Sequence, residues 1–217
     1  MKDTDRINAE ISTHKIIAIM RNMPGDKLLA AADALYEGGI RVIECTFDHS
    51  RSDCIDAGAA AIGALAAHLD GRMVIGAGTV LTISEARAAV EAGARVIVSP
   101  NVNAAVITEA RALGAVAIPG AMTPTEIAAA WEAGAHYVKL FPAGSLGVEY
   151  INAVRAPLSH IPLLAVGGIE PEHIRAYLAA GISGFGIGSP LLPKAAIEAG
   201  NFSEITKRAR TFVEAIV

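Results

Sequence analysis

The stretch WEAGAHYVKL (residues 131–140) contains a complete helix-to-strand transition. The residues before Gly134 suit the last turn of a helix, Gly134 suits a left-handed helix cap, and the apolar run after it suits a buried strand. The same phrase recurs in four other stretches: LYEGGIRVIE (35–44), VEAGARVIVS (90–99), RALGAVAIPG (111–120) and LAAGISGFGI (178–187). Repetition of this transition along the chain indicates a series of βα units.

The apolar runs are short, rich in Val, Ile and Leu, and lack a polar alternate face, which is typical of parallel strands covered on both sides. We place eight strand starts, with helices in the gaps and a last helix over 202–216; the starts lie near Lys15, Arg41, Met73, Val96, Val116, Tyr137, Pro162 and Gly184. Eight βα units predict a (β/α)8 TIM barrel, here with an extra N-terminal helix over 3–12. The alternative is an open doubly wound sheet, but its GxGxxG fingerprint is missing after the first strand. No linker interrupts the units, so we expect residues 1–217 to form a single domain.

Composition narrows the class of protein further. The chain of 217 residues is 53% hydrophobic and has a net charge of −4, which favours one globular core and argues against nucleic acid or an acidic membrane as partner. No apolar run approaches the roughly 18 residues of a spanning helix. The first ten residues carry charges of both signs and lack an apolar leader segment, so we expect a cytoplasmic location. Cys45 and Cys54 suit packing, and the six histidines lack ligand spacing, so we expect neither a metal nor a cofactor.

Lys139 is the most informative polar residue, because it stands inside the apolar run YVKLFPA. Burial lowers the pKa of a lysine, and a neutral amine can form a Schiff base with a carbonyl. The alternative is a structural ion pair between Lys139 and Glu44. Strand periodicity places Lys139 and Phe141 on one face of their strand, and Val42, Glu44 and Thr46 on one face of theirs. If both faces point into the barrel, Glu44 can move protons for the amine.

Active sites of such barrels lie at the carboxyl ends of the strands. Glycines end the last two strands, as Gly167-Gly168 and as Gly186-x-Gly188-Ser189, where many barrels bind phosphate through backbone N–H groups. The alternative is that these glycines only permit tight turns. Arg21 ends the first strand, and its planar fork suits a carboxylate or a phosphate; the alternative is an ordinary surface arginine. We interpret Asp48 and His49 as a solvated loop and Trp131 as packing in the outer helical layer.

Taken together, the runs IIAIMR, VIECTF, VIGAGTVLT, VIVSPN, IPGAMTPTE, VKLFPAGSLG and VGGI resemble the 2-keto-3-deoxy-6-phosphogluconate (KDPG) and 4-hydroxy-2-oxoglutarate (KHG) aldolases. The resemblance extends from about Lys15 to Pro193. It implies a class I aldolase: a metal-free TIM barrel, homotrimeric, that cleaves a 2-keto-3-deoxy acid to pyruvate and an aldehyde.

Carried over by position, the resemblance makes Lys139 the Schiff-base residue and Glu44 the proton carrier. It places the keto-acid carboxylate at Arg21, Thr79 and Pro100, and packs Phe141 on the pyruvyl carbons. The remaining substrate-binding residues that it implies are Val166, Gly167, Gly168, Gly188 and Ser189, the last three at the distal phosphate.

The chain departs from the family pattern at two positions. Asp48 stands where many members carry Arg, and Val166 stands where members specific for the gluconate carry Thr. We expect cleavage of KDPG to pyruvate and glyceraldehyde 3-phosphate, together with cleavage of KHG to pyruvate and glyoxylate. Val166 leaves the galactonate epimer as an alternative, because a missing hydroxyl removes a contact to a substrate hydroxyl. Two further alternatives are a phosphosugar isomerase or synthase barrel and a barrel that binds a sugar phosphate without turnover.

Overall fold

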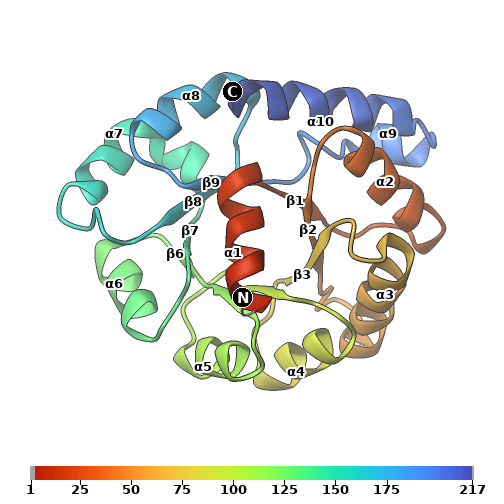
Figure 1. The fold of residues 1–217 in the computed structure, drawn as a ribbon, viewed down its shortest axis with the longest axis horizontal. Helices are drawn as coiled ribbons and strands as arrows, with labels where there is room; N and C mark the ends of the chain where they lie inside the picture. Colours follow the sequence, from red (N-terminus) through yellow and green to blue (C-terminus); the bar gives the residue numbers. More distant parts are fainter. Residues whose placement is uncertain (1–2, 217) are drawn as a thin grey trace.

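The short apolar runs form one parallel sheet in the computed structural model, which describes residues 3–216 (Figure 1). β-Branched residues are frequent in several of the runs, such as 16–20, 42–46 and 96–98, and every residue in them is buried, as expected for a sheet covered on both faces. The strands are β1 Ile16–Met20, β2 Val42–Thr46, β3 Val74–Gly78, β4 Val96–Val98, β5 Val116–Ile118, β6 Gly120–Ala121, β7 Val138–Leu140, β8 Leu163–Val166 and β9 Gly184–Ile187. Every predicted strand begins within one residue of its expected position.

The expected fifth strand is divided into β5 and β6, which gives nine strand segments instead of eight. The division falls at Pro119, which has no N–H to donate to a ladder. The sheet order is β5-β4-β3-β2-β1-β9-β8-β7-β6, so its two edges are consecutive in the chain. Lys139 N donates to Pro119 O at 2.8 Å and His136 N donates to Ala117 O at 3.0 Å across this seam. The predicted barrel is therefore confirmed, in a nearly closed form.

Helices connect the strands and surround the barrel (Figure 1). They are α1 Asp3–His14, α2 Gly25–Glu37, α3 Cys54–Leu69, α4 Ile83–Glu91, α5 Ala104–Ala112, α6 Pro124–Glu132, α7 Ala143–Arg155, α8 Pro171–Ala179, α9 Lys194–Glu198 and α10 Phe202–Ile216. The N-terminal helix confirms the prediction and continues to His14, whereas the short α9 was not predicted. Gly134 has a φ of 98°, as its role at the end of a helix requires. None of the helices within residues 3–216 combines the length and apolar character needed to cross a membrane.

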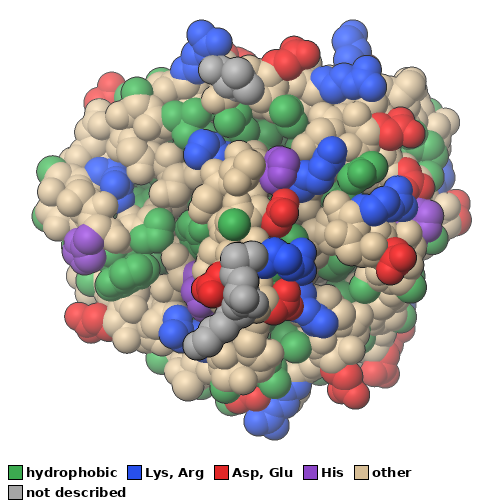
Figure 2. Space-filling model, in the orientation of Figure 1, with side chains coloured by type: hydrophobic (Ala, Val, Ile, Leu, Met, Phe, Trp, Pro, Cys, Tyr) green, Lys and Arg blue, Asp and Glu red, His purple; other side chains and the backbone are tan. Residues whose placement is uncertain are grey.

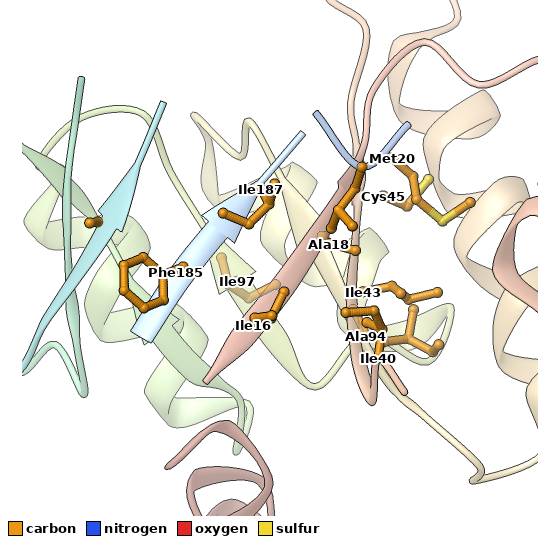
Figure 3. Close-up of a cluster of buried hydrophobic side chains, with 14 of the residues drawn as sticks. Ile16, Ala18, Met20, Ile40, Ile43, Cys45, Ala94, Ile97, Phe185 and Ile187 are labelled. Atoms are coloured by element: carbon orange, nitrogen blue, oxygen red, sulfur yellow. The ribbon is translucent and has the colours of Figure 1, made fainter. Parts of the chain in front are cut away.

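Two apolar layers lie on opposite sides of the strands. Ile16, Ile43 and Ile97 belong to the outer layer, which packs against the helices (Figure 3). Val42, Val116 and Leu164 belong to the interior layer, together with Ile7 and Ile11 of α1. Helix α1 thus lies across one mouth of the barrel, on a face where side chains of both charges are interspersed (Figures 1 and 2). The carboxyl ends of the strands form the opposite mouth, where a site can be built.

A half-buried histidine, His136, links β5 to the segment that precedes β7, where the two edges of the sheet meet. Ala117 N donates to Nδ1 of His136 at 3.1 Å, and burial together with the charge of Arg111 lowers the pKa of His136 below 6.5. Protonation of Nδ1 would remove this acceptor. Because the pKa is lower in the folded state than in the unfolded state, the stabilisation is complete above pH 6.5 and is lost as the pH falls through the folded-state pKa.

We expect His136→Asn, which keeps an acceptor that cannot titrate, to flatten the pH dependence of stability between pH 5 and 7.5. His136→Leu leaves the Ala117 N–H without a partner and should destabilise the protein by about 1–3 kcal/mol at pH 7.5. Urea denaturation of the wild type and both variants across this range measures the effect. An unchanged slope for His136→Asn relative to the wild type would contradict the prediction.

Candidate active site

A cavity of about 860 Å³ opens at the carboxyl ends of the strands. Ten of the eleven residues that the sequence singled out for catalysis or substrate binding line it: Arg21, Thr79, Pro100, Lys139, Phe141, Val166, Gly167, Gly168, Gly188 and Ser189. They come from the ends of β1, β3, β4, β7, β8 and β9, which converge only in the closed barrel. Thr79 adopts a φ of 59°, an uncommon conformation for a β-branched residue and one that is often found at functional sites.

Lys139 projects from the middle of β7 and is 5% exposed. Its Nζ lies 5.0 Å from the ring centroid of Phe141, the residue that directly follows β7. Burial lowers the pKa of Lys139 below 10.5; the carboxylate of Glu44 acts in the opposite direction, and Arg21 adds to the lowering. The amine is therefore neutral more often than that of an exposed lysine at the same pH, which a nucleophile requires.

Glu44 is the eleventh residue; it is 2% exposed and does not line the cavity. Burial raises the pKa of Glu44 above 4.5, against the opposing charges of Lys139 and Arg21. No hydrogen bond or ion pair within 4 Å joins Glu44 to Lys139 among residues 3–216, so the structural ion pair considered from the sequence is not formed. Glu44 Oε1 and the hydroxyl of Thr46 are both buried, and neither has a hydrogen-bond partner among residues 3–216. The carboxyl group thus influences the amine through space and keeps hydrogen-bonding capacity for another molecule.

Gly78 makes room for the carboxyl group. A Cβ at this position would lie 1.7 Å from Glu44 Oε1 and 2.4 Å from its Cδ. Gly76, two residues earlier on the same face, faces Val96 and backbone oxygens instead. The strand therefore provides two glycines of similar burial, of which one contacts Glu44.

We expect Gly78→Ala to displace Glu44 and lower turnover by about 100-fold, since shifts of about 1 Å in a catalytic group have effects of this size. A covalent adduct between pyruvate and the protein should still form, because Lys139 is not displaced. Gly76→Ala is the matched control: it adds the same methyl group without touching Glu44. Equal losses of turnover in the two variants would show that crowding of β3, and not the position of Glu44, is responsible.

Three residues that follow β8 and β9 and line the cavity carry unpaired backbone donors. The N–H groups of Gly168, Gly188 and Ser189 have no hydrogen-bond acceptor among residues 3–216. Gly167 and Gly168 have φ values of 90° and 71°, so they also meet the conformational demand of a tight turn. The turn interpretation of these glycines is confirmed, and the free N–H groups are of a kind that suits an anion.

Arg21 and the residues of α9 complete the charges around the cavity. Arg21 is exposed and makes no hydrogen bond or ion pair within residues 3–216, so its fork is available to a ligand. Lys194 and Glu198 of α9 also line the cavity and were missed from the sequence. The only available signal was their position just after GS, because α9 is too short to show helical periodicity.

The remaining candidates lie elsewhere. His49 Nε2 is 3.0 Å from Glu85 Oε1, and Asp48 accepts hydrogen bonds from Ser50, so both belong to a loop away from the cavity lining. Trp131 lies in the outer helix α6, with its ring 6.3 Å from that of His160. Cys45 is a buried free thiol whose pKa burial raises to about 11. Among residues 3–216, no three His, Cys, Asp or Glu side chains gather as a metal site requires.

A parallel barrel with a buried lysine amine, a nearby carboxyl group and a cavity at the carboxyl ends of its strands is typical of barrel enzymes that form a Schiff base. Residues 7–208 match the model of the KDPG and KHG aldolase family. The chain belongs to this family, and it is therefore a class I aldolase, a carbon–carbon lyase.

Individual relatives cover nearly the whole chain. The 2-dehydro-3-deoxy-6-phosphogalactonate aldolase of Escherichia coli K12 is 35% identical over 92% of this chain and 93% of its own length. The KHG/KDPG aldolase of the same organism is 33% identical over 94% of this chain and 93% of its own. A crystal structure of the KDPG aldolase of Legionella pneumophila, with pyruvate captured as a covalent carbinolamine, has a TM-score of 0.83 and 27% identity, and the match covers 94% of this chain and 96% of that one.

Proposed function

We propose that the protein cleaves a 2-keto-3-deoxy-6-phospho sugar acid, KDPG in the first place, to pyruvate and glyceraldehyde 3-phosphate, and that it also cleaves KHG to pyruvate and glyoxylate. The observation that carries the proposal is the buried amine of Lys139 on the wall of a cavity that also holds a free guanidinium and free backbone donors. The carbinolamine in the Legionella relative supports covalent attachment of pyruvate. We further propose that residues 1–217 form one domain, which the extent of the family match supports.

The neutral Nζ of Lys139 adds to the C2 carbonyl of the substrate to give a carbinolamine, and protonation of its hydroxyl group followed by loss of water gives an iminium ion. Removal of the proton from the C4 hydroxyl then breaks the C3–C4 bond; its electron pair passes to the iminium as an enamine, and the aldehyde leaves. Protonation of C3 gives the pyruvate imine, which water hydrolyses to pyruvate and free Lys139. Glu44 is proposed as the proton carrier, since its raised pKa lets it hold and release a proton closer to neutral pH.

The cavity offers a separate partner for each part of the substrate. We assign the keto-acid carboxylate to Arg21, beside Thr79 and Pro100, and the pyruvyl carbons to the ring of Phe141. We assign the distal phosphate to the free N–H groups of Gly168, Gly188 and Ser189, which can donate hydrogen bonds to it. The proposal includes a homotrimer, which rests on the resemblance to the family and is tested by sedimentation analysis.

One observation favours the galactonate epimer as a second candidate substrate. Val166 presents methyl groups to the cavity, where a threonine hydroxyl could bond a substrate hydroxyl. The two epimers differ at C4 and give the same products, because C4 becomes the aldehyde carbon. Because the products are identical, the two epimers can be distinguished only when each is assayed separately.

Pyruvate release from KDPG, from its galactonate epimer and from KHG, followed with a coupled dehydrogenase, tests the proposal. We expect pyruvate from all three, with the higher kcat/KM on one of the phosphorylated acids, and the ratio between them identifies the epimer. No pyruvate from any of them, together with no covalent adduct with pyruvate, would exclude an aldolase acting on these acids. That result would leave the isomerase, synthase or binding-only alternatives.

A further inference from the structure

The short helix α9 places an ion pair on the wall of the cavity. Lys194 Nζ and Glu198 Oε1 are 3.6 Å apart, with side chains 87% and 63% exposed. Both residues line the cavity, together with Gly188 and Ser189. An exposed pair of this kind contributes little to stability, so a stronger ligand can replace either member.

The backbone of α9 is fixed relative to the free N–H groups. Leu191 N and Leu192 N both donate to Gly188 O at 3.0 Å, in the turn that leads from these groups to the helix. At the other end, Lys27 Nζ donates to Glu198 O at 2.7 Å and ties α9 to α2. Ile197 is 7% exposed and anchors the helix in the core. The side chain of Lys194 therefore starts from a defined position beside Gly188 and Ser189.

The cations of the cavity are divided between two functions. Arg21 is close enough to Lys139 and Glu44 to shift the pKa of both, whereas Lys194 is not among the charges that shift either. Lys194 begins α9, which follows the turn at Gly188 and Ser189, whereas Lys139 is the middle residue of β7. A ligand that extends from Lys139 to the free N–H groups meets Lys194 with its far end.

We propose that Lys194 is a specificity-determining residue that binds the distal phosphate of the substrate, and that Glu198 opposes it by holding the ammonium when the site is free. The inference rests on the proposed function. A phosphate dianion gains a charge-assisted hydrogen bond from Lys194 in addition to those from the backbone N–H groups. Glu198 lowers this gain, because its carboxylate competes for the ammonium and repels the phosphate.

Lys194→Gln and Glu198→Gln test the inference with opposite expected effects. For the phosphorylated substrate, we expect Lys194→Gln to raise KM by about 5- to 20-fold with kcat nearly unchanged, and Glu198→Gln to lower KM by about 2- to 5-fold. KHG has no phosphate, so its kinetics should not change in either variant. Lys207→Gln, on the exposed face of α10, removes the same charge away from the cavity and should leave KM unchanged.

The rate of covalent pyruvate attachment supplies a second phosphate-free reference, whether or not KHG is turned over. Equal KM values for Lys194→Gln and Lys207→Gln would overturn the inference, and so would a parallel loss of pyruvate attachment in Lys194→Gln. Failure of the proposed function looks different, because the wild type would then release no pyruvate from the phosphorylated acids. Raising the salt concentration to 0.5 M should shrink the difference between wild type and Lys194→Gln.

Discussion

Lys139→Met is expected to abolish the covalent adduct that forms with pyruvate in the presence of borohydride, and to lower turnover by at least about 10,000-fold. The thioether cannot add to a carbonyl, and the mechanism has no route around the iminium ion. Intact-mass measurement before and after reduction detects the adduct, and peptide mapping locates it. Mapping is needed because Lys194 also lines the cavity.

The substitution should preserve the fold. Methionine is similar in length to lysine and suits the apolar surroundings of β7, where the amine makes no hydrogen bond or ion pair among residues 3–216. We expect a melting temperature within a few degrees of the wild type, and Lys207→Met serves as the control for loss of a lysine elsewhere. A reduced adduct that persists in Lys139→Met would assign the Schiff base to another amine and end the proposed mechanism.

The fold was predictable because its signals are local and repeated. Five of the helix-to-strand transitions carry a glycine cap and all eight units carry an apolar run, so repeated local signals pointed to one architecture. Pro119, which has no N–H group to donate, was a signal in the sequence for the division of the fifth strand. The prediction placed only the start of that strand, so it did not show where the hydrogen-bonded ladder is interrupted. Helix α9 was missed because its five residues are too few to show a period and because its ends depend on tertiary contacts such as that of Lys27.

The candidate site was predictable in membership but not in geometry. The barrel rule alone brings strand-end residues such as Arg21, Lys139 and Ser189 to one cavity, whatever their distance in sequence. Periodicity assigned Glu44 and Lys139 to one face of their strands, but it could not show that both faces point into the barrel, nor tell an ion pair from two groups that interact at longer range. That distinction depends on how deeply each side chain is buried and on the space that Gly78 leaves for Glu44, and both are properties of the folded barrel.

Glu44→Gln is expected to lower turnover by about 100- to 10,000-fold, the usual contribution of a general acid–base group. The amide is nearly isosteric and cannot carry a proton, so the steps at the C4 hydroxyl and at C3 lose their partner. Covalent attachment of pyruvate should persist in this variant, because Lys139 supplies the nucleophile. Turnover of KDPG and reductive trapping of pyruvate, measured on the same preparation, separate the two effects.

The pH dependence of trapping distinguishes a proton carrier from a group that merely holds the amine in place. Burial lowers the pKa of Lys139, the carboxylate of Glu44 raises it, and Arg21 lowers it. Removing the Glu44 charge must therefore lower the pKa further and move the trapping profile of Glu44→Gln to lower pH. Arg21→Gln removes a like charge that disfavours the ammonium form of Lys139, so its profile should move to higher pH. Because the two variants are expected to shift the profile in opposite directions, a general loss of structure cannot produce both shifts. A trapping profile of Glu44→Gln that moves to higher pH or stays in place would exclude the charge coupling on which the proton-transfer role depends.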